Sequence, residues 1–404
     1  MPDTLRCLYV CYLSLADPLV HSQVVAYLEG LARRGHTVHL LTFDTPMSDD
    51  ARDELRDDLE RRGITWHSRR YHKRPSLPAT VYDATAGAFT ALRIMRRHRL
   101  GAIHARNHVP AATALIVKRL SGCRMIFDLR GLMAEEYVDA GNWKRGGLPY
   151  RLTNWIQGAA IRRADAQVML TEAVRRQLFS AGSNGKPLAV IPCCADLSTI
   201  TGRAGERDEV REELGARDRP VMVYVGKFTG WYLEAEMVDF FAAARAERPD
   251  LLFVILTQSE FQIIEHELER AGIPPSDYRI ARAKPDDVGR YLAAAEFGLS
   301  FVRPCPSKVS SSPTKVGEYL AAGLPVVSTS GIGDVDELLE GRGVGLLVSR
   351  LRRSDYESAA RGALELAADP EARERCRRVA RETLSLEDVG VARYDDLYRQ
   401  VARA

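Results

Sequence analysis

Hydrophobic residues fall into short continuous runs, and between the runs apolar residues recur every three or four positions. The first runs occupy residues 5–14, 36–43, 101–106, 123–130 and 165–171. Runs of this length are typical of buried strands. Residues 21–34 place Leu28 and Leu31 on one helical face, and Gly35 follows where such a helix would end. The alternation predicts βαβ units with right-handed crossovers and a parallel sheet.

A polar segment at residues 201–220 interrupts this pattern, and a second alternating series follows it. Its predicted strands lie at residues 220–226, 251–257, 278–283, 297–302, 325–329 and 343–348. Its predicted helices lie near residues 233–246, 259–271, 285–295, 313–322 and 334–340. The end of the chain also has a helical pattern, and no fixed-period repeat occurs. We therefore expect an α/β protein of two Rossmann-like domains, residues 1–195 and 196–384.

The composition is that of a soluble globular protein. Of the 404 residues, 46% are hydrophobic and 27% are charged, and 57 basic and 54 acidic residues leave a formal net charge of +3. Nothing in this balance points to nucleic acid as a partner. The basic run "RRYHKRP" at residues 69–75 is typical of a solvated loop. Contact of this run with an anionic acceptor or a membrane surface stays open.

Cysteine usage and the apolar start of the chain bear on the compartment. The seven Cys residues are odd in number and lack metal-ligand spacing, so we interpret them as reduced thiols. The run at residues 7–20 is interrupted by Asp17, and it lacks the length of a membrane span and the pattern of a secretory signal. These features predict a cytoplasmic protein, and peripheral membrane contact stays open.

The segment "SSSPTKVGEYLAAGLPVVST" at residues 310–329 combines a serine cluster with the signals of a short helix. Ser312 is expected to cap a helix that begins at Pro313, and Gly323 is expected to end it. A helix N-terminus offers unpaired backbone N–H groups and a partial positive charge. The segment therefore predicts a place where a phosphate or diphosphate can bind.

Lys315 and Glu318 lie on the same face of that predicted helix, one turn apart. A lysine in the first turn opposes the helix dipole, and an anionic ligand would reverse that penalty. A carboxylate one turn deeper has the reach to accept hydrogen bonds from a ribose diol. An intrahelical Lys–Glu pair without any function explains the same two residues and stays open.

Residues 310–340 resemble the donor-site signature of the GT-B glycosyltransferases, in particular the retaining family four group. The order of other segments agrees with this resemblance: "VMLTEAVRRQL" at 168–178, "VIPCCADL" at 190–197 and "VYVGKF" at 223–228. The likeness covers nearly the whole chain and is strongest over residues 165–350. It implies two Rossmann-like domains that face each other across a cleft, the first binding the acceptor and the second the nucleotide sugar. The C-terminal helix, residues 385–404, is expected to pack back on the first domain.

The resemblance implies a donor site in which Glu318 binds the nucleotide ribose. Lys227 and Lys315 would face the leaving diphosphate as catalytic cations, and neighbouring serine and threonine groups would meet the diphosphate and the sugar. The full set implied for the donor nucleotide sugar is Gly226, Lys227, Lys308, Ser310, Ser311, Ser312, Thr314, Lys315 and Glu318.

Two positions depart from the family pattern in this donor site. Ser310 stands where relatives often have a Glu that contacts the donor sugar, so the identity of the sugar does not carry over. Gly230, Trp231 and Tyr232 stand where relatives have a second cation, and Lys308 or Lys315 would have to compensate.

Polar side chains follow two predicted strands of the first domain, where open α/β sheets place ligand-binding groups. They are His104, Arg106, Asn107 and His108 after the first strand, and Asp128, Arg130, Glu135 and Glu136 after the second. Together with His21, these residues are predicted to surround the acceptor, with Asp128 and Arg130 taking part in catalysis. An internal ion-pair network that braces the loop explains the second group as well. Many relatives have a His-Gly pair where this chain has Arg130-Gly131, so the role of that His does not carry over.

The pattern Asp334-Val335-Asp336 matches the short DxD motif that binds a metal in the other large glycosyltransferase fold. Its position before "ELLE" favours a helix cap at Asp334, completed by Glu337 as a capping box. We therefore expect no essential metal. The segment "GIGDVD" does not extend to a dinucleotide-binding GxGxxG, so no cofactor is expected beyond the nucleotide sugar itself.

The function implied by the resemblance is transfer of a sugar from a nucleoside diphosphate to an acceptor hydroxyl with retained anomeric configuration. The acceptor is expected to be a glycan, a lipid-linked molecule or a natural product, and the abundance of Arg and Ala suggests a bacterial source. A sugar-nucleotide epimerase of the same fold stays open, and it would release an altered sugar without a second substrate. A non-catalytic nucleotide-sugar-binding protein also stays open, and it would bind donor without turnover.

Overall fold

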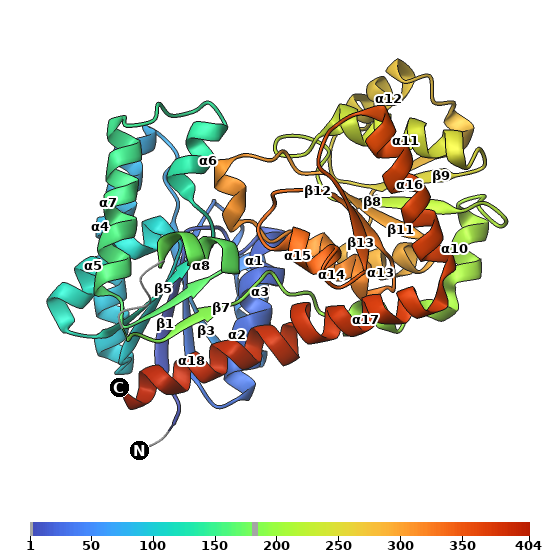
Figure 1. The fold of residues 1–404 in the computed structure, drawn as a ribbon. Helices are drawn as coiled ribbons and strands as arrows, with labels where there is room; N and C mark the ends of the chain where they lie inside the picture. Colours follow the sequence, from blue (N-terminus) through green and yellow to red (C-terminus); the bar gives the residue numbers. More distant parts are fainter. Residues whose placement is uncertain (1–2, 180–184) are drawn as a thin grey trace. The chain divides into compact units, whose positions relative to one another are not determined.

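The computed structural model describes residues 3–179 and 185–404, and the chain divides into two compact units (Figure 1). Unit 1 contains the residues up to Pro192 together with Val389–Ala404. Unit 2 contains Cys193–Asp388. Two α/β units with parallel sheets confirm the predicted fold class, and the return of the last helix to unit 1 is part of that fold.

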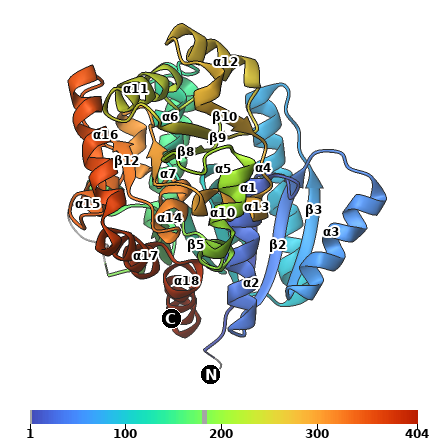
Figure 2. The same cartoon turned by 90° about the vertical axis from the view of Figure 1, so that its right-hand side faces the viewer.

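Unit 1 is built on a parallel sheet with the strand order β3-β2-β1-β4-β5-β6-β7. Its strands are β1 Arg6–Cys11, β2 Thr37–Asp44, β3 Ile64–Arg70, β4 Ala102–Arg106, β5 Arg124–Leu129, β6 Ala166–Met169 and β7 Leu188–Val190. Its helices are α1 Pro18–Val20, a π-helical turn His21–Val25, α2 Ala26–Arg33, α3 Asp49–Arg61, α4 Ser76–His98, α5 His108–Ser121, α6 Met133–Asp139, α7 Leu148–Arg163, α8 Glu172–Leu178 and α18 Ala392–Arg403. Strand β3 is one of the two edge strands, and α3 lies against it (Figure 2).

Unit 2 is built on a second parallel sheet with the order β10-β9-β8-β11-β12-β13. Its strands are β8 Val221–Val225, β9 Leu252–Leu256, β10 Tyr278–Ala281, β11 Phe297–Ser300, β12 Val326–Thr329 and β13 Gly345–Val348. Its α-helices are α9 Ser198–Thr201, α10 Arg207–Glu213, α11 Glu234–Glu247, α12 Phe261–Arg270, α13 Pro285–Ala293, α14 Thr314–Ala321, α15 Val335–Leu339, α16 Arg353–Ala368 and α17 Pro370–Leu384. A short 3-10 helix, Pro306–Ser310, precedes α14.

The apolar composition of the strands follows from burial on both faces of each sheet. All five residues of β9, Leu-Phe-Val-Ile-Leu, are buried, and five of the six residues of β1 are buried. Helices cover both faces of a parallel sheet, so its strands need no polar face and are continuously apolar. This is why the short apolar runs in the sequence indicated the strands.

Each sheet has one point where the strand order reverses direction. In unit 1 this point lies between β1 and β4, and in unit 2 it lies between β8 and β11. In open α/β sheets, the carboxyl ends of the strands at such a point form a crevice that binds ligands. We therefore expect ligand-binding sites in the loops that follow these four strands.

Two predicted helix caps are wrong in detail. Helix α14 begins at Thr314, one residue later than expected, and the Ser312 hydroxyl accepts a hydrogen bond from the backbone N–H of Cys193 at 3.1 Å instead of capping the helix. Asp334 precedes α15 without a side-chain capping bond to it. The carboxylate of Asp336 instead accepts from the backbone N–H of Gly331, at 3.0 Å.

Candidate functional site

The residues predicted to form a donor site in unit 2 lie at the carboxyl ends of β8 and β11. Gly226 and Lys227 follow β8, and the 3-10 helix and α14 follow β11. Backbone contacts join the two loops: Tyr232 forms a bridge with Val302, and the N–H of Arg303 donates to the carbonyl of Trp231 at 2.8 Å. The reversal of strand order thus brings segments about 70 residues apart in the sequence together.

Lys315 is the most unusual group in this crevice. Its side chain is buried, and its ammonium lies 4.1 Å from the ring centroids of both Tyr224 and Tyr232. The ammonium has no hydrogen-bond partner in the described structure. Burial lowers the pKa of Lys315 to about 7, and the charge of Glu318 opposes that shift. A buried ammonium that contacts two aromatic rings and makes no hydrogen bond is electrostatically suited to an anionic ligand.

Gly226 makes room for the ammonium of Lys315. Its φ of 135° lies in the region that side chains rarely adopt, and an added Cβ would come within 2.9 Å of the Lys315 ammonium. The absence of a side chain therefore lets Lys315 approach the backbone directly after β8.

Glu318 lies one turn after Lys315 in α14 and is half-buried. Burial raises the pKa of its carboxyl group, and the nearby Lys315 lowers it in part. The Lys315 ammonium makes no hydrogen bond to the Glu318 carboxylate in the described structure, although the two charges interact. The carboxylate is placed to accept hydrogen bonds from hydroxyl groups of a ligand bound beside α14.

Lys308 adds a second buried cation near the same loops. Its ammonium lies 3.7 Å from the centroid of the Trp231 ring. Trp231 and Tyr232, which stand where relatives have a second cation, therefore each have a lysine ammonium over the ring. The sequence signal for this arrangement was a pair of adjacent aromatic residues in a glycine-containing loop after a strand.

The remaining predicted donor residues have different surroundings. Lys227 is exposed, and its backbone carbonyl accepts a hydrogen bond from the Tyr224 hydroxyl. Ser310 is buried and donates to the carbonyl of Ser307 at 2.8 Å, while the N–H of Ser311 donates to the carbonyl of Lys308 at 3.0 Å. The Ser311 amide is therefore part of the turn itself. Thr314 is the first residue of α14 and is partly exposed.

In unit 1, Asp128 lies at the end of β5 in a fully buried network. Tyr394 donates to it at 2.8 Å, Arg130 lies 3.8 Å away, and His104 lies 3.5 Å away. Burial alone would raise the pKa of Asp128, but the charge of Arg130 and the nearby His104 ring bring it down to about 2. The second ring nitrogen of His104 pairs with the Tyr398 hydroxyl at 2.8 Å. Because Tyr394 and Tyr398 belong to α18, this network fastens the last helix to the sheet of unit 1.

The other residues predicted to surround the acceptor are spread around this end of the sheet. Arg106 is buried and one of its terminal guanidinium nitrogens has no hydrogen-bond partner. Asn107 has a positive φ of 71° and its side chain pairs with His108 at 2.6 Å. Glu135 accepts from Tyr150 at 2.7 Å and forms an ion pair with Arg145.

Glu136 and His21 complete the predicted acceptor set. Glu136 lies in the first turn of α6, where its carboxylate would touch a Cβ added at Gly131. His21 is half-buried and opens the π-helical turn after α1. These positions place both residues on segments that follow the carboxyl ends of β1 and β5.

A cavity of about 1110 Å³ opens in unit 1 at the carboxyl ends of β1 to β5. Residues directly after these strands line its floor, among them Tyr12, Thr45, Tyr71, His108 and Met133. Its walls are mostly apolar side chains of α4, α5, α6 and α7 and of the segment between α6 and α7, including Leu77, Val81, Ala112, Tyr137, Trp143, Leu152, Trp155 and Ile156. The sequence analysis did not identify this cavity.

Asp83 of α4 holds one wall of this cavity in place. Its buried carboxylate accepts from the Tyr12 hydroxyl at 2.8 Å and from the backbone N–H of His72 at 3.0 Å, and it pairs with the ring of His72 at 2.6 Å. Tyr12 follows β1 and His72 follows β3, so one carboxylate fixes two of the loops beside the cavity. None of the described helices is long and apolar enough to cross a membrane.

Two family models match the chain, and together they span most of it. The model for glycosyltransferase family 4 matches residues 20–199, and the model for glycosyl transferases group 1 matches residues 206–383. A search of curated protein sequences finds no match.

Several solved structures share the fold over nearly their whole length. A glycosyltransferase from Rickettsia africae ESF-5 superimposes with a TM-score of 0.74 at 12% identity, covering 99% of each chain. The sucrose-phosphate synthase of Thermosynechococcus elongatus gives a TM-score of 0.73 at 16% identity, covering 98% of this chain and 99% of its own. Anabaena Alr3699/HepE, solved in complex with UDP and glucose, gives 0.71 at 14% identity, covering 99% of this chain and 98% of its own. At these identities the likeness establishes the GT-B fold.

Proposed function

We propose that this chain, which belongs to the family four glycosyltransferases and has their GT-B fold, is a retaining enzyme. We also propose that its acceptor carries a large apolar group. Transfer of a sugar from a nucleotide sugar follows from the family. The stereochemistry and the kind of acceptor are our proposals. Each rests on a separate part of the chain, the first on unit 2 and the second on unit 1.

The buried ammonium of Lys315 is the observation that carries the donor assignment. As the glycosidic bond breaks, negative charge grows on the leaving diphosphate, and a preorganised cation in a site of low polarity stabilises that charge most strongly. The diphosphate would lie beside Lys315 and the N-terminus of α14, with Lys227 as a further cation. Binding of the anion would raise the pKa of Lys315 and keep its ammonium protonated.

Glu318 is proposed to accept hydrogen bonds from the ribose hydroxyls of the donor. Its half-buried carboxylate lies one helical turn from Lys315, so one ligand can meet both groups. We find no side chain that is clearly a general base in the described crevice, and we propose that an oxygen of the leaving diphosphate takes the proton of the acceptor hydroxyl. Attack from the same face as the departing group retains the anomeric configuration.

The cavity of unit 1 supports an acceptor with a lipid chain or a polycyclic or aromatic group rather than a plain polysaccharide. Its walls are mostly apolar, and its floor is at the carboxyl ends of the strands, where the sequence predicted the acceptor. Removing about 200 Å² of apolar surface from water contributes on the order of 5 kcal/mol. Arg119 and Arg163 also line the cavity, so an anionic group on the acceptor would be tolerated at its edge.

Turnover with amphiphilic acceptors tests the retaining reaction and the acceptor class together. Nucleotide sugars would be incubated with alkyl, aryl and polyprenyl acceptors, and the anomeric configuration of the product would be read from NMR coupling constants. We expect a product with the configuration of the donor. An inverted product would refute retention, and an altered sugar released without acceptor would indicate an epimerase.

A pair of alanine substitutions tests whether the cavity holds the acceptor. Ala112→Phe fills space between α5 and the other walls, while Ala86→Phe adds the same ring on α4 at a position that does not line the cavity. We expect Ala112→Phe to raise the KM for the acceptor at least tenfold without changing nucleotide affinity, and Ala86→Phe to leave both unchanged. An unchanged acceptor KM in Ala112→Phe would refute this site.

A further inference from the structure

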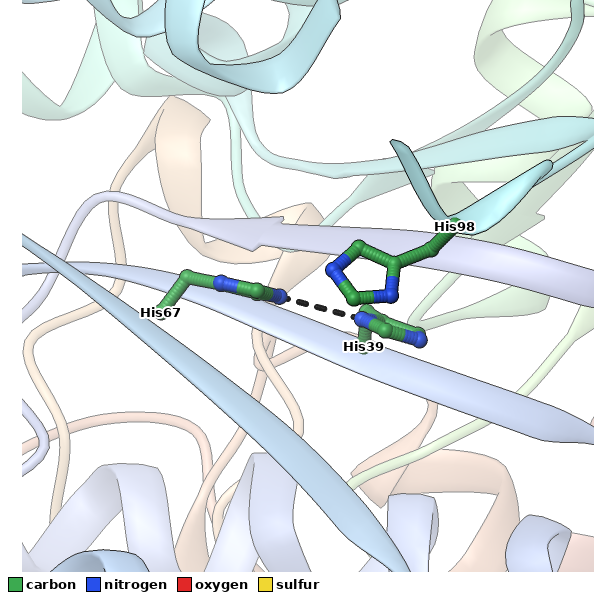
Figure 3. A group of neighbouring side chains, drawn as sticks. All are labelled: His39, His67 and His98. Atoms are coloured by element: carbon green, nitrogen blue, oxygen red, sulfur yellow. Dashed lines mark hydrogen bonds between the residues drawn. The ribbon is translucent and has the colours of Figure 1, made fainter. Parts of the chain in front are cut away.

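Three histidines meet in unit 1 on the side of the sheet that α4 covers (Figure 3). His39 lies in β2, His67 lies in the neighbouring strand β3, and His98 is the last residue of α4. In the parallel register Leu41 pairs with His67, so His39 and His67 are two positions apart along the sheet and point to the same face. Segments far apart in the sequence thus bring three imidazoles together.

The three rings are close enough to share one ligand. Nδ1 of His39 lies 3.0 Å from Nε2 of His67, and one nitrogen from each of the three rings lies within 4.8 Å of the other two. The ring of His98 has its centroid 4.5 Å from that of His39 and 5.7 Å from that of His67. His39 is buried, whereas His67 and His98 are half-buried, so the cluster borders solvent.

We propose that His39, His67 and His98 form a site for one divalent transition metal ion, such as Zn²⁺, that fastens the end of α4 to strands β2 and β3. Imidazole nitrogens bind Zn²⁺ at about 2.0–2.1 Å, which places tetrahedral ligands about 3.4 Å apart. The 3.0 Å separation between Nδ1 of His39 and Nε2 of His67 is close to that value. A small rotation of the His98 side chain would bring its nitrogen to a similar distance from both. Water reaching the half-buried rings supplies the fourth ligand.

The electrostatic surroundings of the cluster favour neutral ligands. Burial of His39 and partial burial of His67 disfavour the protonated imidazolium, and a neutral imidazole is the form that binds a metal ion. His98 stands in the last turn of α4, where the helix dipole favours a bound cation. Arg6 faces His39 and Arg97 faces His67, and both arginines oppose the bound cation.

The proposed site is separate from the groups assigned to sugar transfer. The first half of α4, from Ser76 to Thr85, lines the apolar cavity, and His98 is at the opposite end of the same helix. A metal at the histidine cluster would therefore hold α4 in place rather than touch a substrate. A metal ion bound here would not conflict with the expectation that sugar transfer needs no metal, because that expectation concerns unit 2.

Titration of tag-free, metal-stripped protein with Co²⁺ and then Zn²⁺ tests this proposal. Tetrahedral Co²⁺ absorbs visible light, so the spectrum reports the geometry, and calorimetry with Zn²⁺ reports the stoichiometry. The variants are His67→Ala and His98→Ala, from two different elements, with His266→Ala as the control because it removes an exposed histidine of α12 in unit 2. Circular dichroism and nucleotide binding would verify that each variant is folded.

We expect one Co²⁺ per wild-type chain with a tetrahedral spectrum, displacement by Zn²⁺, and a rise in Tm when Zn²⁺ is added. His67→Ala and His98→Ala should each weaken Zn²⁺ binding at least tenfold and lose the Tm rise, and His266→Ala should behave as wild type. The proposal would be overturned if the wild type showed no tetrahedral Co²⁺ absorption, or if both cluster variants bound Zn²⁺ as tightly as the wild type; the three histidines would then be packing residues.

Discussion

The low pKa of Lys315 predicts that nucleotide binding weakens as the pH rises above neutrality. With a pKa of about 7 in the free protein, the protonated fraction of Lys315 falls from about one half at pH 7 to about one hundredth at pH 9. A diphosphate binds the protonated form and raises the pKa, so binding takes up a proton. The Kd should therefore rise by up to about 50-fold between pH 7 and pH 9.

Calorimetric titration at several pH values, in buffers of different ionisation enthalpy, measures both the Kd and the protons taken up. Lys315→Met keeps a side chain of similar length without the charge, so its Kd should be weaker at pH 7 and nearly constant up to pH 9. Lys227→Met is the matched control, because it removes an exposed cation and should weaken binding while keeping the slope. A flat pH profile in the wild type, or the same slope in Lys315→Met, would refute the assignment of Lys315 to the diphosphate.

The same substitution should stabilise the ligand-free protein. The folded-state pKa of Lys315 lies below its unfolded value of about 10.5, so folding expels a proton and stability rises with pH between about 7 and 10.5. At pH 7 the buried ammonium costs on the order of 4 kcal/mol from this shift, and contacts with two tyrosine rings offset part of it. Urea denaturation of Lys315→Met should therefore show roughly 2–4 kcal/mol more stability than wild type at pH 7.

Three further outcomes follow from the geometry. Gly226→Ala adds a Cβ that would come within 2.9 Å of the Lys315 ammonium in a strained backbone conformation, so calorimetry should show nucleotide binding weakened at least tenfold; unchanged binding would contradict the close approach. Asp128→Ala leaves buried partners without their carboxylate, and urea denaturation should show a loss of about 3–5 kcal/mol; a loss below about 1 kcal/mol would mean the network is not structural. Asp83→Ala frees the loops after β1 and β3, so the KM for the acceptor should rise while nucleotide affinity stays the same, and the reverse pattern would contradict the role of Asp83.

The fold could be predicted from the sequence because its main signals are local. Strands buried on both faces are continuous apolar runs, as in β9, and a glycine can mark the end of a helix, as Gly122 does for α5. The helix that carries Lys315 and Glu318 was placed within one residue for the same reason. The face that the two residues share follows from helical geometry alone.

Long-range contacts explain where the sequence was insufficient. Ser312 looked like a cap, but its hydroxyl is used by the backbone of Cys193, 119 residues away in the chain. His104 was predicted to meet the acceptor, and nothing in the sequence indicated that its buried ring pairs with Tyr398, 294 residues away. The cavity of unit 1 needs side chains from four helices, none of which has a sequence motif. The exposure of an apolar side chain such as Trp155, which lines the cavity, is visible only in the structure.

Titration of UDP, GDP, ADP and TDP into the wild type and into Glu318→Ala, without added metal, tests the central claim most directly. The account predicts that one of these nucleotides binds the wild type, that its affinity falls at least tenfold in Glu318→Ala, and that binding takes up a proton at pH 8 because of Lys315. Binding of no nucleotide, or equal binding by both proteins, would contradict the donor site.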